Sequence, residues 1–167
     1  MSRFLLSLLF LTLCACRPAL GVYVDASESA ELLEATENAV GLWNDSLGFD
    51  VLDLRITDNP RAAYVDPFSV IIETRDDIYG PSDRNGNTLT LGVVNHVGLR
   101  RAGIDGMLPV TLDWLIAHEL GHVLGLGHSD EPTNLMYADP WENQEGFALT
   151  AKQVRRARAI AGIEGAL

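Results

Sequence analysis

The chain has 167 residues, of which 47% are hydrophobic, and this supply allows one sizeable core but hardly two. Its 12 basic residues face 23 acidic ones, which gives a formal net charge of −11. That charge opposes binding to nucleic acid and to anionic lipid surfaces, so we expect neither as a partner. We expect the protein to be a monomer.

The N-terminus predicts export. Arg3 is followed by the apolar run Phe4–Leu13, which is too short to span a bilayer and is typical of a secretion signal. Leu13-Cys14-Ala15-Cys16 resembles a bacterial lipobox with Cys16 at the lipidated position, and the alternative is an ordinary signal peptide cut nearby. We therefore expect a signal peptide over residues 1–16 and one domain over 19–167. The predicted location is the cell envelope as a lipoprotein, otherwise the periplasm or outside, with membrane contact only through this anchor.

The first half of the domain predicts strands around one helix. A helix capped by Ser27 and running to about Asn44 would share an apolar face among Leu32, Leu33, Val40 and Trp43. Segments with branched or alternating apolar residues predict strands at Gly21–Asp25, Phe49–Ile56, Phe68–Thr74 and Thr88–Val94. Asp76–Asn87 is rich in Asp, Gly, Pro and Asn and predicts a surface loop.

Two helices are expected in the second half. The first covers residues 111–124, with Thr111 as a plausible N-cap and Gly125 and Gly127 as its stop signals. The second runs from about Thr150 to Ala161 and should direct Val154 and Ile160 toward the core. A sheet formed early with helices packed on it makes the predicted fold class α+β.

The first of these helices carries a metal-ligand pattern. His118 and His122 are four residues apart and therefore lie on one face of a helix, from which both can reach one ion at roughly 2.0–2.1 Å. Gly125 permits the positive φ that ends the helix sharply, so that His128 can approach the same ion from outside the helix. Three neutral nitrogen ligands leave a fourth position for water, which is typical of a catalytic zinc.

Glu119 fits the role of general base. It adjoins His118 but points partly around the helix, so its carboxylate should lie near the open coordination position and not on the metal. There it could take a proton from zinc-bound water and pass it to the leaving amine of a peptide bond. For the helical His-Glu-x-x-His alone, the alternatives are a coincidental match, a structural zinc site or two surface histidines. The added Gly125 and His128 argue against all three.

The segment His118–His128 resembles the zinc signature of the metzincin peptidases. Asn134-Leu135-Met136-Tyr137 looks like the methionine turn of that clan, and Ser129 after the third histidine makes the matrixins the most similar family. The specific match covers about residues 110–161. The resemblance implies a matrixin-like zincin fold, with a twisted mixed sheet, a long active-site helix and a C-terminal helix. It also implies a zinc metalloendopeptidase that acts on protein or peptide substrates.

Departures from the matrixin pattern lead to further expectations. A second, structural zinc would need several upstream histidines, but only His96 is present, so we expect one catalytic zinc and place His96 at a strand end or in a loop. Tyr137 directly follows Met136 and is expected to be structural, not an extra ligand. A calcium ion could bind oxygens of Asp83, Asn85 and Asn87, although a solvated turn explains them better.

The resemblance also suggests a substrate pocket. Trp114 lies one helical turn before His118, at the matrixin position that helps to form the pocket floor for the side chain after the cleaved bond. Placement of Trp114 in the core is the alternative, and Tyr137, Ala138 and Pro140 are further pocket residues. An extended peptide is expected to pair with an edge strand at Thr88–Val94. The runner-up function is a surface lipoprotein that binds protein or metal with little turnover.

Overall fold

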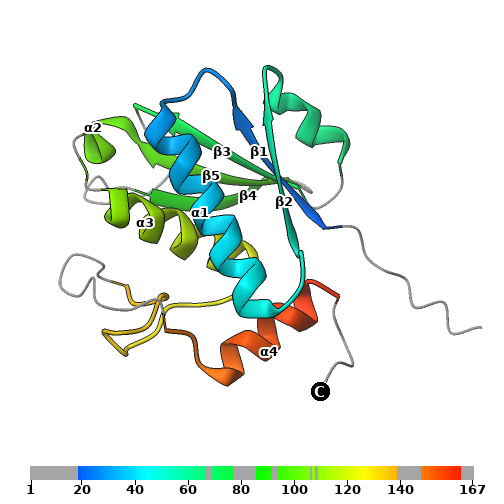
Figure 1. The fold of residues 1–167 in the computed structure, drawn as a ribbon, viewed down its shortest axis with the longest axis vertical. Coiled ribbons are helices and arrows are strands. Elements are labelled where there is room, and N and C mark those ends of the chain that lie inside the picture. Colours follow the sequence, from blue (N-terminus) through cyan, green and yellow to red (C-terminus); the bar gives the residue numbers. More distant parts are fainter. Residues whose placement is uncertain are drawn as a thin grey trace, which may run out of the picture.

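A five-stranded sheet forms the centre of the computed structural model (Figure 1). The structure describes residues 19–66, 69–76, 86–91, 94–105, 107, 109–138 and 148–162. The strand order is β2-β1-β3-β5-β4, with β4 antiparallel to β5 and the other neighbours parallel. The strands are β1 Leu20–Asp25, β2 Leu52–Thr57, β3 Val70–Arg75, β4 Gly86–Leu91 and β5 Val94–Arg100. The mixed sheet of the predicted α+β fold is therefore confirmed.

Successive side chains of a strand point to opposite faces of the sheet, and apolar side chains form one cluster on each face. Val22 and Val24 of β1 belong to the main core, whereas Tyr23 between them belongs to a smaller cluster on the opposite face. The smaller cluster lies under a 3-10 helix, η1, over Pro60–Val65. The main core lies under the long helices, so the sheet has one thickly covered face.

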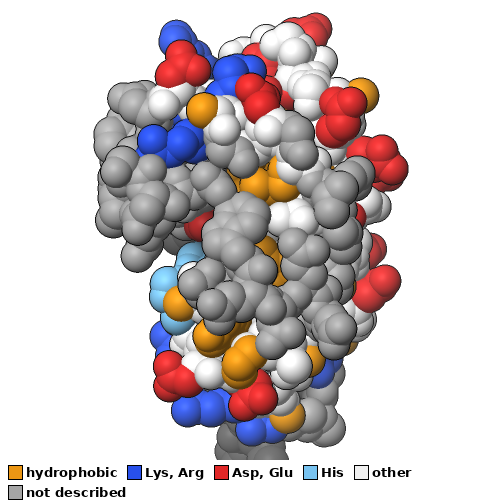
Figure 2. All heavy atoms as spheres, turned by 90° about the vertical axis from the view of Figure 1, so that its left-hand side faces the viewer, with side chains coloured by type: hydrophobic (Ala, Val, Ile, Leu, Met, Phe, Trp, Pro, Cys, Tyr) orange, Lys and Arg blue, Asp and Glu red, His pale blue; other side chains and the backbone are white. Residues whose placement is uncertain are grey.

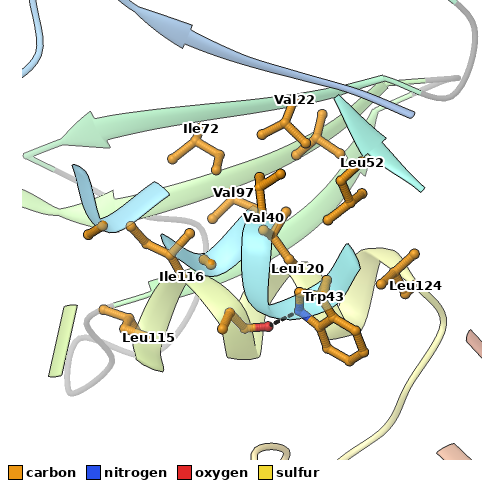
Figure 3. Close-up of a cluster of buried hydrophobic side chains, with 14 of the residues drawn as sticks. Val22, Val40, Trp43, Leu52, Ile72, Val97, Leu115, Ile116, Leu120 and Leu124 are labelled. Atoms are coloured by element: carbon orange, nitrogen blue, oxygen red, sulfur yellow. Dashed lines mark hydrogen bonds between the residues drawn. The ribbon is translucent and has the colours of Figure 1, made fainter. Parts of the chain in front are cut away.

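Helices α1, Ala30–Leu47, and α3, Pro109–Val123, cover that face together (Figures 1 and 3). Trp43 of α1 is fully buried and donates its indole N–H to the carbonyl oxygen of Ala117 at 2.8 Å, shown by the dashed line in Figure 3. Asn38 of α1 donates to the carboxylate of Asp113 at 3.1 Å, and burial raises the pKa of Asp113. These contacts fix α3 against α1.

The ends of α1 differ slightly from the prediction. Ser29, and not Ser27, is the N-cap, because its hydroxyl accepts the Leu32 N–H at 3.2 Å. Ser27 instead donates its hydroxyl and its backbone N–H to the carboxylate of Asp25. The helix continues to Leu47, three residues past the expected end, and Gly48 closes it at φ +72°.

The predicted strand Thr88–Val94 is wrong in its limits. Residues 86–91 form β4, and Val94 begins β5, which pairs back along β4 with Leu91 opposite Val94. His96 is the third residue of β5, 8% exposed, and therefore lies in neither the loop nor the strand end that we expected. The 3-10 helix η1 and the short helix α2, Arg101–Ile104, were also not predicted.

The second-half helices agree with the prediction in place and differ in detail. Helix α3 begins at Pro109, two residues before the expected Thr111 cap, which suits the preference of proline for a first helical turn. Helix α4 covers Ala151–Ile160, and Thr150 and Gln153 form a reciprocal capping box at its start. Ile160 is 42% exposed, so the prediction that it is a core residue is wrong; the fully buried residue of α4 is Ala157. Among the described helices, none is long and apolar enough to cross a membrane.

Candidate metal centre and active site

Three histidines gather at the C-terminal end of α3. His118 and His122 come from successive turns of the helix, and Gly125, at φ +75°, turns the chain out of it. The Leu126 N–H donates to the Gly121 carbonyl at 3.0 Å, which closes the helix end and directs the chain toward His128. One ligand atom of each histidine lies within 4.8 Å of those of the other two. The predicted ligand residues are thus brought together by the fold.

The three histidines, called the trio below, become more exposed in chain order. His118 is 5% exposed, His122 is half-buried and His128 is exposed. In Figure 2 histidine side chains gather at one place on the face shown, so the group opens to solvent. An ion held there would have an inner side closed by protein and an outer side that a substrate can reach.

Backbone carbonyls orient the two helical rings. The His118 Nδ1 lies 2.9 Å from the Leu135 carbonyl oxygen, and the His122 Nδ1 lies 2.9 Å from the Leu126 carbonyl oxygen. Because a carbonyl can only accept, each Nδ1 must carry the proton, and each neutral ring keeps its lone pair on Nε2. This is the tautomer that a metal-ligating histidine needs, so the residues present fit a zinc ion.

Glu119 is held against the sheet edge. The residue is 5% exposed, and its Oε2 accepts a hydrogen bond from the Thr88 hydroxyl of β4 at 2.5 Å. The three-histidine group is the one potential metal-holding cluster of His, Cys, Asp and Glu within the described residues, and Glu119 is not part of it. The carboxylate therefore lies beside the ligand set but is no member of it.

Met136 lies in a turn below α3. It is fully buried, its N–H donates to Asn134 Oδ1 at 2.9 Å, and its carbonyl accepts the Ser129 N–H at 2.7 Å. Its thioether occupies the space in which a side chain on Gly121 would lie. The same turn supplies the Leu135 carbonyl that orients His118, so the turn supports the trio from beneath.

Helix α4 is joined to this turn by a pair of carboxamides. The Asn134 Nδ2 donates to Gln153 Oε1 at 2.9 Å, and the Gln153 Nε2 donates back to Asn134 Oδ1 at 3.0 Å. Asn134 is 3% exposed, so this reciprocal pair is largely shielded from water. Gln153 also belongs to the capping box of α4, and the start of that helix is therefore coupled to the position of Met136.

Replacing Asn134 by alanine is expected to lower the free energy of unfolding by about 1–3 kcal/mol, because a buried backbone N–H and a carboxamide lose their partners. Replacing Gln153 by alanine should cost a similar amount, and the double variant should cost less than the sum of the two. Denaturant unfolding of the four proteins measures this coupling. Lys152→Ala, an exposed neighbour on α4, is the control and should leave stability unchanged. Strictly additive losses would contradict the pairing.

Trp114 lies in the core, and its ring also contacts His118; its role in a substrate pocket stays a prediction. It is 6% exposed and belongs to the main core, and its ring centroid lies 4.8 Å from that of His118 at an interplanar angle of 32°. The indole is thus a core residue that stacks on the innermost histidine. Tyr137 is half-buried and Ala138 is exposed just beyond the methionine turn, whereas Pro140, Cys16, Asp83 and Asn85 lie outside the described residues.

His96 lies on the opposite face of the sheet from the main core, because it alternates with Val97 along β5. Its Nε2 is 3.2 Å from the Tyr64 hydroxyl and its Nδ1 is 3.4 Å from a carboxylate oxygen of Glu73. These contacts give it a structural environment of its own. Whether the protein takes up a second zinc stays a prediction.

Several residues of the site were not found by sequence reasoning. Thr88 contacts Glu119, Gly121 accommodates Met136, and Asn134 and Gln153 form the carboxamide pair. Each of these contacts joins residues distant in the chain or depends on the space around a glycine, so local spacing carried no signal for it. The exception is Thr150-x-x-Gln153, whose spacing is that of a capping box.

Comparison with known proteins identifies a matching family model and relatives of similar sequence. The family model described as Matrixin matches residues 74–161, just over half of the chain, and this range contains the trio, Glu119 and Met136. Interstitial collagenase B of Mus musculus is 36% identical over 75 residues, which is 44% of this chain and 16% of that protein. Matrix metalloproteinase-20 of Homo sapiens is 27% identical over 149 residues, covering 84% of this chain and 30% of the relative. The chain therefore spans at most 30% of the length of these two relatives.

A solved structure is similar in fold. The crystal structure of metalloproteinase-II from Bacteroides fragilis superposes with a TM-score of 0.56 and 16% sequence identity, over 85% of this chain and 53% of that one. At this level of identity the likeness concerns the arrangement of the elements. It agrees with the fold expected for a zinc metallopeptidase, in which a mixed sheet supports an active-site helix.

Proposed function

The chain belongs to the matrixin family, whose model matches more than half of it, and on this premise we propose that it is a zinc-dependent endopeptidase. Two observations together carry the proposal. The ligand atoms of three histidines converge, and the buried residue Glu119, next to His118 in the chain, is not one of that cluster. A site that only stores a metal has no use for such a base. We assign His118, His122 and His128 as the ligands and Glu119 as the catalytic residue.

The proposed reaction is hydrolysis of a peptide bond. His118, His122 and His128 would hold a zinc ion, which would supply Lewis-acid chemistry by polarising the scissile carbonyl and lowering the pKa of bound water. Glu119 accepts one proton from the attacking water and delivers it to the nitrogen of the leaving amine. The hydrogen bonds from His118 and His122 to backbone carbonyls keep the two rings in the ligating tautomer throughout.

The substrate is proposed to bind as an extended peptide along β4. This strand is at the edge of the sheet, and its neighbour within the described residues is β5 alone. Its other edge can therefore offer backbone N–H and carbonyl groups to a further strand. Helix α3 lies beside β4, so a peptide paired there would pass the histidine trio.

The direct test is hydrolysis of a random-peptide library by the purified protein, with zinc measured by elemental analysis. We expect cleavage within peptides, about one zinc ion per chain, and loss of activity in a chelator that zinc restores. Zinc binding without any cleavage would instead favour the surface binding protein considered above. A reproducible content of two ions would contradict the single-zinc prediction.

Trp114→Leu is expected to change the side chain preferred after the cleaved bond. The bulky indole stacked on His118 should make the proposed pocket shallow and favour small or medium side chains. A leucine should shift the preference toward large aromatic ones, by on the order of tenfold in relative kcat/KM. Profiling both enzymes on one peptide library measures the shift. An unchanged preference in a folded, active variant would mean that Trp114 serves the core alone.

A further inference from the structure

Edge strand β4 contacts the side chain of Glu119 at two positions on the same face. The Thr88 hydroxyl lies 2.5 Å from Glu119 Oε2 and 3.1 Å from the Glu119 backbone carbonyl. A hydroxyl has one proton, and the shorter contact, to the side-chain oxygen, takes it. Two residues earlier, a Cβ on Gly86 would lie 2.9 Å from Glu119 Oε1 and 3.3 Å from its Cγ, so the carboxylate rests against the Gly86 backbone.

These two contacts restrict both oxygens of one carboxylate. Glutamate has three rotatable side-chain bonds, and a free carboxylate would sample several orientations relative to the histidines. With Oε2 bound to Thr88 and Oε1 against Gly86, the group is confined to one orientation before substrate arrives. Proton transfer depends steeply on such alignment, because small displacements of a base reduce the rate strongly.

The strand that restricts Glu119 is also the strand proposed to pair with the substrate. A peptide held by the backbone of β4 would have its position relative to α3 set by residues 86–91. The Thr88 hydroxyl sets the position of the base relative to those same residues. The same strand would therefore position both the substrate and the base.

We propose that Thr88 is a positioning residue of the active site, whose hydroxyl holds the Glu119 carboxylate in the orientation needed for proton transfer. This inference rests on the proposed peptidase function. The role is to orient and not to react: Thr88 touches neither the scissile bond nor an ion, and acts through Glu119. Glycine at position 86 completes the arrangement, because any side chain there would displace the carboxylate.

The test compares Thr88→Val and Thr88→Ser in the full-length, zinc-loaded protein on a peptide that the wild type cleaves. Valine keeps the shape but removes the proton donor, so kcat should fall about tenfold to one-hundredfold while KM changes less than about twofold. Serine keeps the donor and should recover most of kcat. Thr57→Val, the same change on the opposite edge strand β2, should leave both constants as in the wild type.

A second measurement needs no turnover. In the zinc-free wild type, a hydroxyl proton bound to a buried carboxylate exchanges slowly with water, so NMR should detect the Thr88 hydroxyl proton and should lose it in Glu119→Ala. A wild-type kcat in Thr88→Val, a serine variant as impaired as the valine variant, or a rapidly exchanging hydroxyl would each overturn the proposal. If the wild type cleaves no peptide, the proposed function fails instead, and the NMR result still decides whether Thr88 holds Glu119.

Discussion

Replacing Glu119 by alanine is expected to abolish peptide hydrolysis while zinc stays bound. The change removes the proposed base and none of the three histidines, so kcat should fall by about 10²–10⁴-fold or more with about one ion per chain retained. Glu119 is 5% exposed, and no carboxylate of the described residues joins the histidine cluster. Steady-state kinetics and elemental analysis on the same samples measure the two effects separately.

Two comparison variants make the result specific. His122→Ala removes a ligand and should lose both zinc and activity, which separates loss of the ion from loss of the base. Glu37→Ala makes the same chemical change at an exposed position of α1, away from the site, and should behave as the wild type. If Glu119→Ala cleaves peptides at the wild-type rate, the assigned mechanism is wrong.

The centre of the site could be predicted because its geometry is local. His118 and His122 share a helix face through the helical repeat alone, and Gly125 needs a positive φ whatever surrounds it. The helix that carries them is long and apolar, so its position along the chain was also predictable within two residues at its start. Such features depend on backbone geometry, which neighbouring elements do not change.

Features that depend on distant contacts could not be predicted. Apolar residues recur through residues 88–94, so the pattern alone predicted one strand there. The structure instead has the end of β4 and the start of β5, with Leu91 opposite Val94. His96 was predicted at a strand end or in a loop, and its burial could not be foreseen because Tyr64 of η1, which contacts it, lies 32 positions earlier in the chain. Burial of a polar side chain follows from its partners, and those are visible only in the folded molecule.

The support of the site was hidden for the same reason. Gln153 and Asn134 pair across 19 positions, and Thr88 meets Glu119 across 31. The capping-box spacing of Thr150 and Gln153 marks the helix start, but nothing in the local sequence marks these two distant contacts, since threonine, asparagine and glutamine are common in loops and strands. The motif therefore pointed to the proposed ligands and base, whereas the residues that contact and orient them become apparent from three-dimensional packing.

Gly121 provides the sharpest test of that packing. A Cβ at this position would lie 3.0 Å from Met136 Cε and 3.0 Å from Trp43 Cζ2, and closer still to Met136 Sδ. Met136 and Trp43 are both fully buried, so neither can move into solvent. Trp43 is also fixed by its hydrogen bond to Ala117, shown in Figure 3, so the methionine turn has to give way.

Alanine at this position is therefore expected to destabilise the protein although it favours a helix. Overpacking a core costs about 1–3 kcal/mol, against a gain of about 0.5–1 kcal/mol from replacing a helical glycine. Displacement of the turn should also move the Leu135 carbonyl away from His118 and weaken zinc binding by about 10–100-fold. Thermal unfolding of the zinc-free protein and chelator competition measure these two effects.

Gly41 supplies the matched control, because it is also a helical glycine but a Cβ there meets no heavy atom within 4 Å. Gly41→Ala should raise the free energy of unfolding by about 0.5–1 kcal/mol and leave zinc affinity unchanged. The same substitution is thus expected to have opposite signs on α1 and α3. If Gly121→Ala also raised the melting temperature and kept its zinc, Met136 would have room to move, and the turn would not be held by its contact with the active-site helix.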